Sequence, residues 1–292
     1  MNEKINAFFQ DVFSVNENKA TRDEIKERII YNAKLKGINM WGLVFAIILV
    51  SIGLNIDSET VVVGAMMISP LMGGIQGIGY ALATTNFKYF KRVLVGFIIE
   101  ILVCLVTSFI YFSFSPIDTQ NSVLLNEYSP KIWDAIIALV GGAAAILSIT
   151  RKNSSTTVLS GAAIACTIMP PICKAGYGIS RLDIVYTLNS LYLFFINAFF
   201  ICLATIIILR IMKIPRRRGA NRKEGIKIFF NIVVISIITL IPSSIFAYQA
   251  INETVLESNI KKYINLEFPK YDTQSVKTNV NLDKNLIEVV LI

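Results

Sequence analysis

Two stretches of the chain follow one pattern. Val61–Leu82 reads VVVGAMMISPLMGGIQGIGYAL, and Val158–Ile179 reads VLSGAAIACTIMPPICKAGYGI. They align without a gap at an offset of 97 residues, with seven identities in 22 positions. The identities include glycine, methionine and tyrosine, which an apolar composition does not by itself bring into one register. The match predicts an internal repeat centred on these two stretches.

The composition is typical of a membrane protein. Of the 292 residues, 54% are hydrophobic and 16% are charged, and the mean hydropathy is +0.60. Soluble domains carry about 25% charged residues, which argues against an ordinary soluble enzyme and against disorder. Seven apolar segments are each long enough to cross a bilayer core of about 30 Å as a helix. These predicted spans are Met40–Ile56, Val61–Ala83, Val93–Phe114, Trp133–Ile149, Val158–Ile179, Leu188–Leu209 and Ile228–Tyr248.

The positive charges predict the orientation of these spans. The segment before the first span and the loops after the second, fourth and sixth hold 20 lysines and arginines, whereas the alternate loops hold only Lys131 and Arg181. Cytoplasmic loops are enriched in these residues, so we expect a cytoplasmic N-terminus and an external C-terminal segment in a multi-pass protein of the cell (inner) membrane. Topology and anionic lipid headgroups thus account for the net charge of +8, and nucleic acid is not needed as a partner.

The repeat and the orientation together predict an inverted pair. Each copy holds three spans, an odd number, so the second copy enters the membrane from the opposite side. Secondary transporters use this architecture, with substrate sites near the midplane between the repeats. The expected fold class is an all-α polytopic membrane protein with seven spans, two inverted three-helix repeats and a small external α+β tail. The expected parts are cytoplasmic amphipathic helices (1–39), membrane repeat 1 (40–114), an external loop (115–132), membrane repeat 2 (133–213), a basic cytoplasmic loop with the seventh span (214–249) and the tail (250–292).

Helix-breaking residues lie at the centre of both repeat stretches. The first holds Ser69-Pro70 and Gly73-Gly74, and the second holds Pro170-Pro171 at the positions that match the glycine pair. Proline removes a backbone donor, and backbone freed at membrane depth must be buried in protein or line a watery cavity. We expect both spans to be discontinuous helices that meet near the midplane. The alternative is a pair of kinked, closely packed helices that use Gly73 and Gly77 for contact.

Polar side chains within the spans complete the candidate binding site. Lys174 lies in the second stretch, and Glu100 in the third span matches Asn197 in the sixth at the same offset. A charge at mid-helix costs about 2.5–3.5 kcal/mol, so these side chains should face the bundle interior. Lys174 would then bind an anionic group and Glu100 would act as a coupling carboxylate; alternatively the two form an ion pair, or Lys174 extends towards water. The candidate substrate or ion-binding residues are Lys174, Glu100, Asn197, Gln76, Ser69, Gly73, Gly74, Pro170 and Pro171.

Several chemistries lack the residues they need. The chain has no histidine, which removes Ser-His and Cys-His sites and histidine metal ligands. Its four cysteines lie inside apolar runs and form no metal-binding motif or disulfide framework. We therefore expect no cofactor, no metal and no enzymatic activity. A dyad of Ser69 and Lys174 is the weak enzymatic alternative.

The two ends of the chain are polar. Residues 1–39 predict two amphipathic helices, and a capping box of Thr21 and Glu24 opens the second one. We expect this second helix to lie on the inner membrane surface or to pack against cytoplasmic loops. In the tail, Asn252–Leu266 predicts a helix, and Ser275–Leu282 with Leu286–Ile292 a hairpin. A lone hairpin is marginal in water and leaves an open edge, so we expect pairing with another subunit or a truncated chain; the alternative is a loosely ordered tail.

One motif resembles a known family. The string GAMMISPLMGGIQGIGYALAT at Gly64–Thr84 is similar to the signature of a prokaryotic membrane family, domain of unknown function 389, and the preceding Asp23–Ser58 also resembles it. The resemblance covers roughly residues 20–215. It implies a polytopic prokaryotic membrane protein, but no activity and no site residues.

These observations predict a transporter or channel-like permeation protein. Its site would lie between the second and fifth spans and would take a small solute or ion, with a slight preference for an anion because of Lys174. Its partners would be the lipid bilayer, that solute and further copies of the chain in a homo-oligomer. The alternative is a non-transporting membrane scaffold or sensor that assembles through its external tail.

Overall fold

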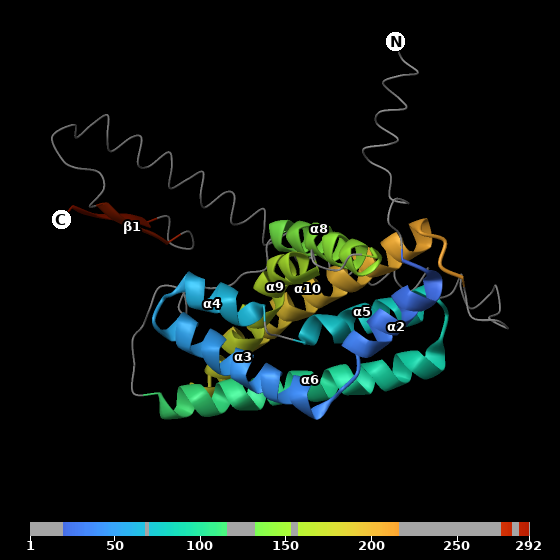
Figure 1. The fold of residues 1–292 in the computed structure, drawn as a ribbon. Helices are drawn as coiled ribbons and strands as arrows, with labels where there is room; N and C mark the ends of the chain where they lie inside the picture. The colour runs from blue at the N-terminus through green and yellow to red at the C-terminus, as the bar shows by residue number, and fades with distance from the viewer. Residues whose placement is uncertain are drawn as a thin grey trace, which may run out of the picture. The chain divides into compact units, whose positions relative to one another are not determined.

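The computed structural model describes residues 20–67, 70–115, 132–152, 157–215, 276–281 and 286–291. Within them the chain forms eight helices and a two-stranded sheet, which belong to two separate units divided after Ile237 (Figure 1). The helices are α2 (Arg22–Asn32), α3 (Gly37–Asn55), α4 (Glu59–Met66), α5 (Leu71–Ala83), α6 (Phe87–Phe114), α8 (Ile132–Ile149), α9 (Thr157–Ser180) and α10 (Ile184–Ile211). The predicted span Ile228–Tyr248 and the predicted helix Asn252–Leu266 lie outside the described residues.

Three of these helices, α3, α6 and α10, are long and apolar enough to cross a membrane. Helices α4 and α5 pass the same test together as one span that bends by 50° at the break between them. Helix α8 is a shorter apolar helix over Trp133–Ile149. These lengths and compositions make the chain a membrane protein.

Helices α6 and α10 begin in the same way and have the same length of 28 residues. Each follows a residue with positive φ, Thr85 at 55° and Leu182 at 58°. The next residue caps the helix: the Asn86 side chain accepts from the backbone N–H of Tyr89, and Asp183 accepts from that of Tyr186. Both caps satisfy an amide that the first helical turn leaves free. All these positions differ by the offset of 97 residues.

Aromatic contacts recur at the same offset. Tyr80 and Tyr89 meet edge to face with ring centroids 6.2 Å apart, and Tyr177 and Tyr186 do the same at 5.8 Å. Phe97 in α6 and Phe194 in α10 occupy the same position in the two repeats, 97 residues apart, and they contact each other. Their rings stack with centroids 6.2 Å apart and an interplanar angle of 16°.

Two glycine contacts are reciprocal between the halves. A Cβ on Gly79 of α5 would lie 2.7 Å from Cγ2 of Thr205 in α10, and a Cβ on Gly176 of α9 would lie 2.5 Å from Cβ of Ser108 in α6. Gly176 matches Gly79 and Thr205 matches Ser108 at the offset. In both places glycine allows a neighbouring helix to approach closely, which is how membrane helices pack.

Helix α2 packs against the ends of three other helices. Its capping box is present: the Thr21 backbone N–H donates to Oε2 of Glu24 at 2.7 Å, and the Glu24 N–H donates to Oγ1 of Thr21 at 3.3 Å. Ile25 and Ile29 are fully buried in a cluster with residues of α5, α8 and α10. The sequence suggested a place on the inner membrane surface or against cytoplasmic loops, whereas the structure packs this helix against α5, α8 and α10. The other cluster members include Tyr80, Ile146 and Leu209.

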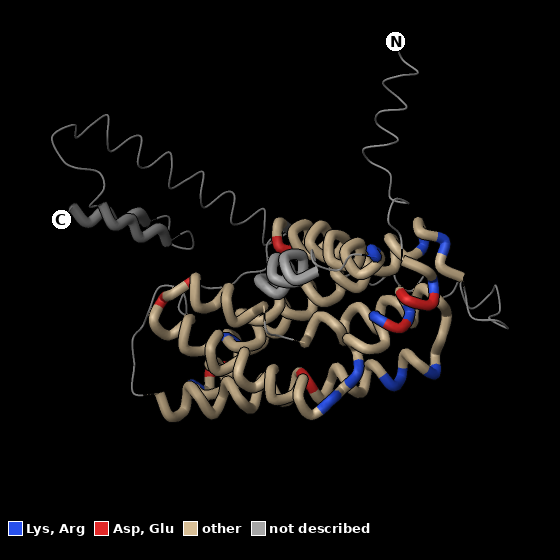
Figure 2. Tube along the Cα trace, viewed as in Figure 1, with Lys and Arg blue, Asp and Glu red and all other residues tan. Residues whose placement is uncertain are grey.

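Most of the described lysines and arginines lie at one end of the helical unit (Figure 2). This basic end is formed by α2 and its link to α3, the start of α6, the end of α8 and the end of α10. The lysines and arginines of these segments include Arg28, Lys34, Lys36, Lys88, Lys91, Arg92, Arg151, Lys152 and Lys213.

The second unit contains a β-hairpin. Strand β1 (Val276–Asn281) pairs antiparallel with β2 (Leu286–Leu291), with Val276 opposite Leu291 and Asn281 opposite Leu286. This register places the strands where the alternating pattern of the tail predicted them.

Candidate functional site

The break between α4 and α5 interrupts the first repeat stretch. Helix α4 ends at Met66 and α5 begins at Leu71, with Pro70 as the residue before the helix. The Gly73 backbone N–H donates to the Pro70 carbonyl at 2.9 Å, so the new helix starts immediately after the proline. Ser69 lies outside the described residues. The first half of the predicted discontinuity is therefore present, at the proline and ahead of the glycine pair.

The second repeat stretch is not broken. Helix α9 runs from Thr157 to Ser180 with Pro170 and Pro171 inside it, so the expectation of a discontinuous helix there is wrong. A proline removes one intrahelical hydrogen bond, but its fixed φ near −65° is compatible with a helix. Neighbouring membrane helices can support such a helix, and α9 packs against both α6 and α10.

The glycine pair has a packing role inside α5. A Cβ on Gly74 would lie 2.9 Å from Oε2 of Glu100 and 2.9 Å from Cδ2 of Phe97. The backbone carbonyl of Asn32, at the end of α2, lies directly against Gly73. The two glycines thus leave space on one side for the Glu100 carboxylate and on the other for the end of α2.

Glu100 is buried in the middle of α6, with an exposed fraction of 4%. Its Oε2 is shielded from solvent and has no hydrogen-bond partner within the described part of the chain. A carboxylate in this environment is expensive to bury, since no hydrogen bond from the described residues offsets the lost hydration of its Oε2. The structure thus places a titratable group beside the helix that follows the break.

Lys174 is among the largest fully buried side chains of the described residues, with an exposed fraction of 0%. It therefore does not extend to water, as one of the sequence interpretations allowed. The position in α5 that matches Lys174 is Gly77, where a Cβ would lie 2.6 Å from Cβ of Ala33.

Gln76 and Asn197 are both 2% exposed and lie in α5 and α10. Gln76 lines a cavity of about 270 Å³ together with Pro70 and Gly73. The rest of its wall comes from the end of α2, the start of α3 and the end of α8. The structure thus brings together Pro70, Gly73, Gly74, Gln76 and Glu100 around the start of α5.

Sequence reasoning did not find the contribution of α2. The Arg28 guanidinium donates to the carbonyls of Ile149 and Arg151 and, at 3.3 Å, to that of Lys152, so it caps the end of α8. Asn32 and Asn39 also line the cavity beside Gln76. These contacts join residues more than 30 positions apart, and no local pattern indicates them. The capping box was the available signal that a helix begins at this place.

The comparisons with known proteins concern the same region. Residues 66–203 match the model of the family described as Domain of unknown function (DUF389). This range includes Gln76, Glu100, Lys174 and Asn197. An uncharacterised protein of Methanocaldococcus jannaschii is 26% identical over 216 residues, which are 72% of this chain and 67% of the relative. No solved structure matches the chain. The match over residues 66–203 confirms the resemblance to the DUF389 family that the motif at Gly64–Thr84 carries.

Proposed function

We propose that this protein is a permeation protein, a transporter or a channel, that moves a small solute or ion across a membrane without converting it chemically. One observation carries the proposal. The Glu100 carboxylate is buried within an apolar helix, its Oε2 has no hydrogen-bond partner among the described residues, and it lies against α5 just after a break in a membrane span. Ionisable residues in membrane spans are costly and commonly mark ion and substrate pathways.

The proposed architecture is a pair of inverted three-helix units, α3 to α6 and α8 to α10. The stacked Phe97 and Phe194 support it, because two matching residues meet each other only near a twofold axis that relates the units. The reciprocal contacts Gly79–Thr205 and Gly176–Ser108 also support it, since a twofold axis exchanges one pair for the other. Such interfaces between inverted repeats hold the sites of secondary transporters.

The proposed orientation has the basic end in the cytoplasm. The described lysines and arginines gather there, as cytoplasmic loops require (Figure 2). The cavity beside Gln76 then lies near the cytoplasmic side of the break. Lys174 would supply positive charge to the path, which favours an anion as the solute.

The test is a flux measurement on the full chain in liposomes. We expect uptake of at least one solute from a panel of chloride, sulfate, phosphate, sodium, potassium and protons. Glu100→Gln and Lys174→Met should each reduce that flux at least tenfold, because they remove the two buried charges. Lys91→Met, an exposed lysine at the same end, is the matched control and should leave the flux unchanged. No flux of any solute from folded protein would contradict the proposal.

The hairpin favours a second candidate function. Strands β1 and β2 pair only with each other among the described residues, and another chain could extend an outer edge of this hairpin. A scaffold or sensor that assembles into a homo-oligomer through this hairpin would show no flux, and proline substitutions in β1 would reduce its oligomer mass.

A further inference from the structure

A cavity lies at the start of α5, bordered by four segments of the chain. Its volume is about 270 Å³, several times the roughly 30 Å³ that one water molecule occupies in the liquid. Its lining includes Asn32 at the end of α2, Asn39 at the start of α3, Gln76 of α5 and Ser148 of α8, beside apolar residues of the same segments. Four polar residues thus border one space between apolar helices.

Gln76 is the most deeply buried of the amides in this wall. Its Nε2 is shielded from solvent and has no hydrogen-bond partner within the described residues. Leaving a buried amide without a partner is unfavourable, so native structures normally pair such a group with protein, water or ligand. Because Gln76 lines the cavity, a molecule bound there is a candidate partner for this amide.

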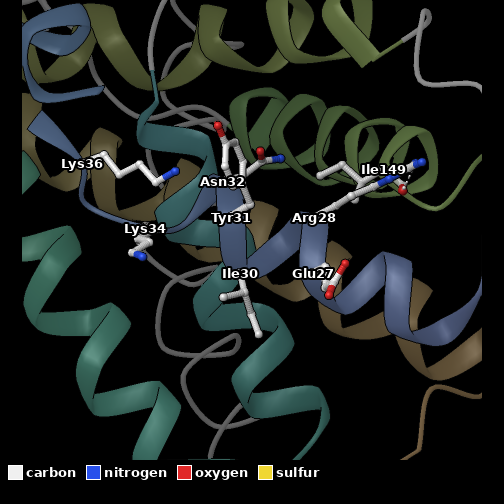
Figure 3. Close-up of a pocket in the computed structure, with 8 residues that line it drawn as sticks. All are labelled: Glu27, Arg28, Ile30, Tyr31, Asn32, Lys34, Lys36 and Ile149. Atoms are coloured by element: carbon white, nitrogen blue, oxygen red, sulfur yellow. Dashed lines mark hydrogen bonds between the residues drawn. The ribbon is translucent and has the colours of Figure 1, made fainter. Parts of the chain in front are cut away.

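A larger cleft of about 670 Å³ adjoins this cavity, and the two share Tyr31, Asn32 and Ile149 (Figure 3). Lys34 and Lys36, from the link between α2 and α3, line the cleft together with a single acidic residue, Glu27. The Lys36 ammonium lies 4.1 Å from the centroid of the Tyr31 ring, at the boundary of the two spaces.

The charge of the cleft is positive even when its arginine is left aside. Arg28 also lines the cleft, but its guanidinium is held by carbonyls at the end of α8. The remaining charged residues of the lining are two lysines and one glutamate, so the lining carries a net positive charge. A cleft with low-dielectric walls concentrates ions of the opposite sign. The cleft thus attracts anions towards the amide-lined cavity behind it.

We propose that the cavity beside Gln76 is a binding site for a small oxyanion, which enters past Lys34 and Lys36 and accepts a hydrogen bond from the Gln76 amide. This inference rests on the proposed permeation function and names its substrate class. The same chemistry suits a free oxyanion, such as sulfate or phosphate, and the phosphate headgroup of an anionic lipid.

Binding is measured on the full chain in nanodiscs, with radiolabelled sulfate and phosphate as the probes. In nanodiscs of neutral phosphatidylcholine we expect saturable binding that Gln76→Leu weakens about tenfold, the effect of losing one charge-assisted hydrogen bond. Lys34→Met and Lys36→Met should weaken sulfate binding by a smaller factor than Gln76→Leu does. That factor should grow as the salt concentration is lowered, because screening decreases. Lys91→Met, exposed at the same end but outside both spaces, is the control for charge and should bind as the unmodified chain does.

A second arm identifies the source of the oxyanion. Nanodiscs containing phosphatidic acid should compete with sulfate if the headgroup enters the same site. Competition that Gln76→Leu abolishes supports the headgroup, and sulfate binding without competition supports the free ion. Binding that is absent in both arms, or that Gln76→Leu leaves unchanged while the variant remains folded, overturns the site.

The outcome is separable from that of the flux measurement. Sulfate binding that depends on Gln76 without any flux would keep the site and contradict permeation. Flux of a cation that Gln76→Leu leaves unchanged would keep permeation and contradict the oxyanion site.

Discussion

At the scale of the residue, Gly74 leaves the space that the Glu100 carboxylate occupies. A methyl group there would lie 2.9 Å from both Oε2 of Glu100 and Cδ2 of Phe97, closer than normal van der Waals contact. We therefore expect Gly74→Ala to destabilise the protein by about 1–3 kcal/mol, the usual cost of overpacking. Thermal unfolding in detergent measures it.

The control for this substitution is Gly64→Ala in α4. A Cβ on Gly64 meets nothing within 4 Å, and alanine is the better helix former by about 1 kcal/mol. Gly64→Ala should therefore leave the midpoint unchanged or raise it. A Gly74→Ala variant that unfolds at the same temperature as the unmodified chain would contradict the close approach of Glu100.

Glu24 provides a pH-dependent residue outside the membrane helices. The hydrogen bond from the Thr21 backbone N–H holds the pKa of the Glu24 carboxyl below its usual value of 4.5. A lowered folded-state pKa stabilises the helix start above pH 4.5, and this stabilisation is lost as the pH falls through the folded value. We expect hydrogen exchange at the start of α2, corrected for intrinsic rates, to speed up in that acidic range.

Glu24→Gln keeps an acceptor but removes the titration, so its exchange should not depend on pH in this way. Equal pH dependence in Glu24→Gln and the unmodified chain would show that another group is responsible.

The buried polar residues could be predicted from the sequence because each interrupts a long apolar run. Gln76, Glu100, Lys174 and Asn197 are all buried, as such residues must be when a helix faces lipid. Their neighbours could not be predicted. The contact of Gly74 with Glu100 depends on the angle between α5 and α6, which no local pattern fixes.

At the scale of the element, the starts of α6 and α10 are the most similar parts of the two halves. Asn86 and Asp183 cap them through the same hydrogen bond, to Tyr89 and Tyr186. Asn86→Ala and Asp183→Ala should each destabilise the protein by about 1 kcal/mol, the typical cost of losing a cap. Chemical denaturation in mixed micelles measures both.

The conservative exchanges Asn86→Asp and Asp183→Asn keep a capping oxygen and should restore most of the lost stability. Loss of stability in only one of the two alanine variants would contradict equivalent roles for these caps.

Helices were easier to predict than their breaks. The break before α5 falls at Pro70, whereas the two prolines of α9 stay inside a continuous helix. Proline weakens a helix in both places, but the outcome depends on whether neighbouring helices hold the backbone in line. Both α5 and α9 pack against α6 and α10, so these neighbours do not by themselves separate the two cases, and neither do the residues alone.

At the scale of the whole molecule, the offset of 97 residues links sequence and structure. It was read from one pair of stretches, and the same offset relates the caps, the tyrosine pairs and the stacked phenylalanines. Helix α2 has no part in the repeat stretches, and its place against Gly73 could not be derived from them. The proposed path therefore combines a repeated scaffold with a separate helix at its basic end.

The central claim is that water and solute reach the start of α5 from the basic end, and thiol labelling tests it most directly. The chain is first freed of its own cysteines by replacement with alanine, and a single cysteine is then introduced by Gln76→Cys or by Ile75→Cys. Position 76 lines the cavity, whereas position 75 is buried in the same helix and does not line it. A membrane-impermeant maleimide added on the cytoplasmic side should label Gln76→Cys and not Ile75→Cys, and sulfate should slow the reaction. Protection of both positions in folded protein would contradict the account.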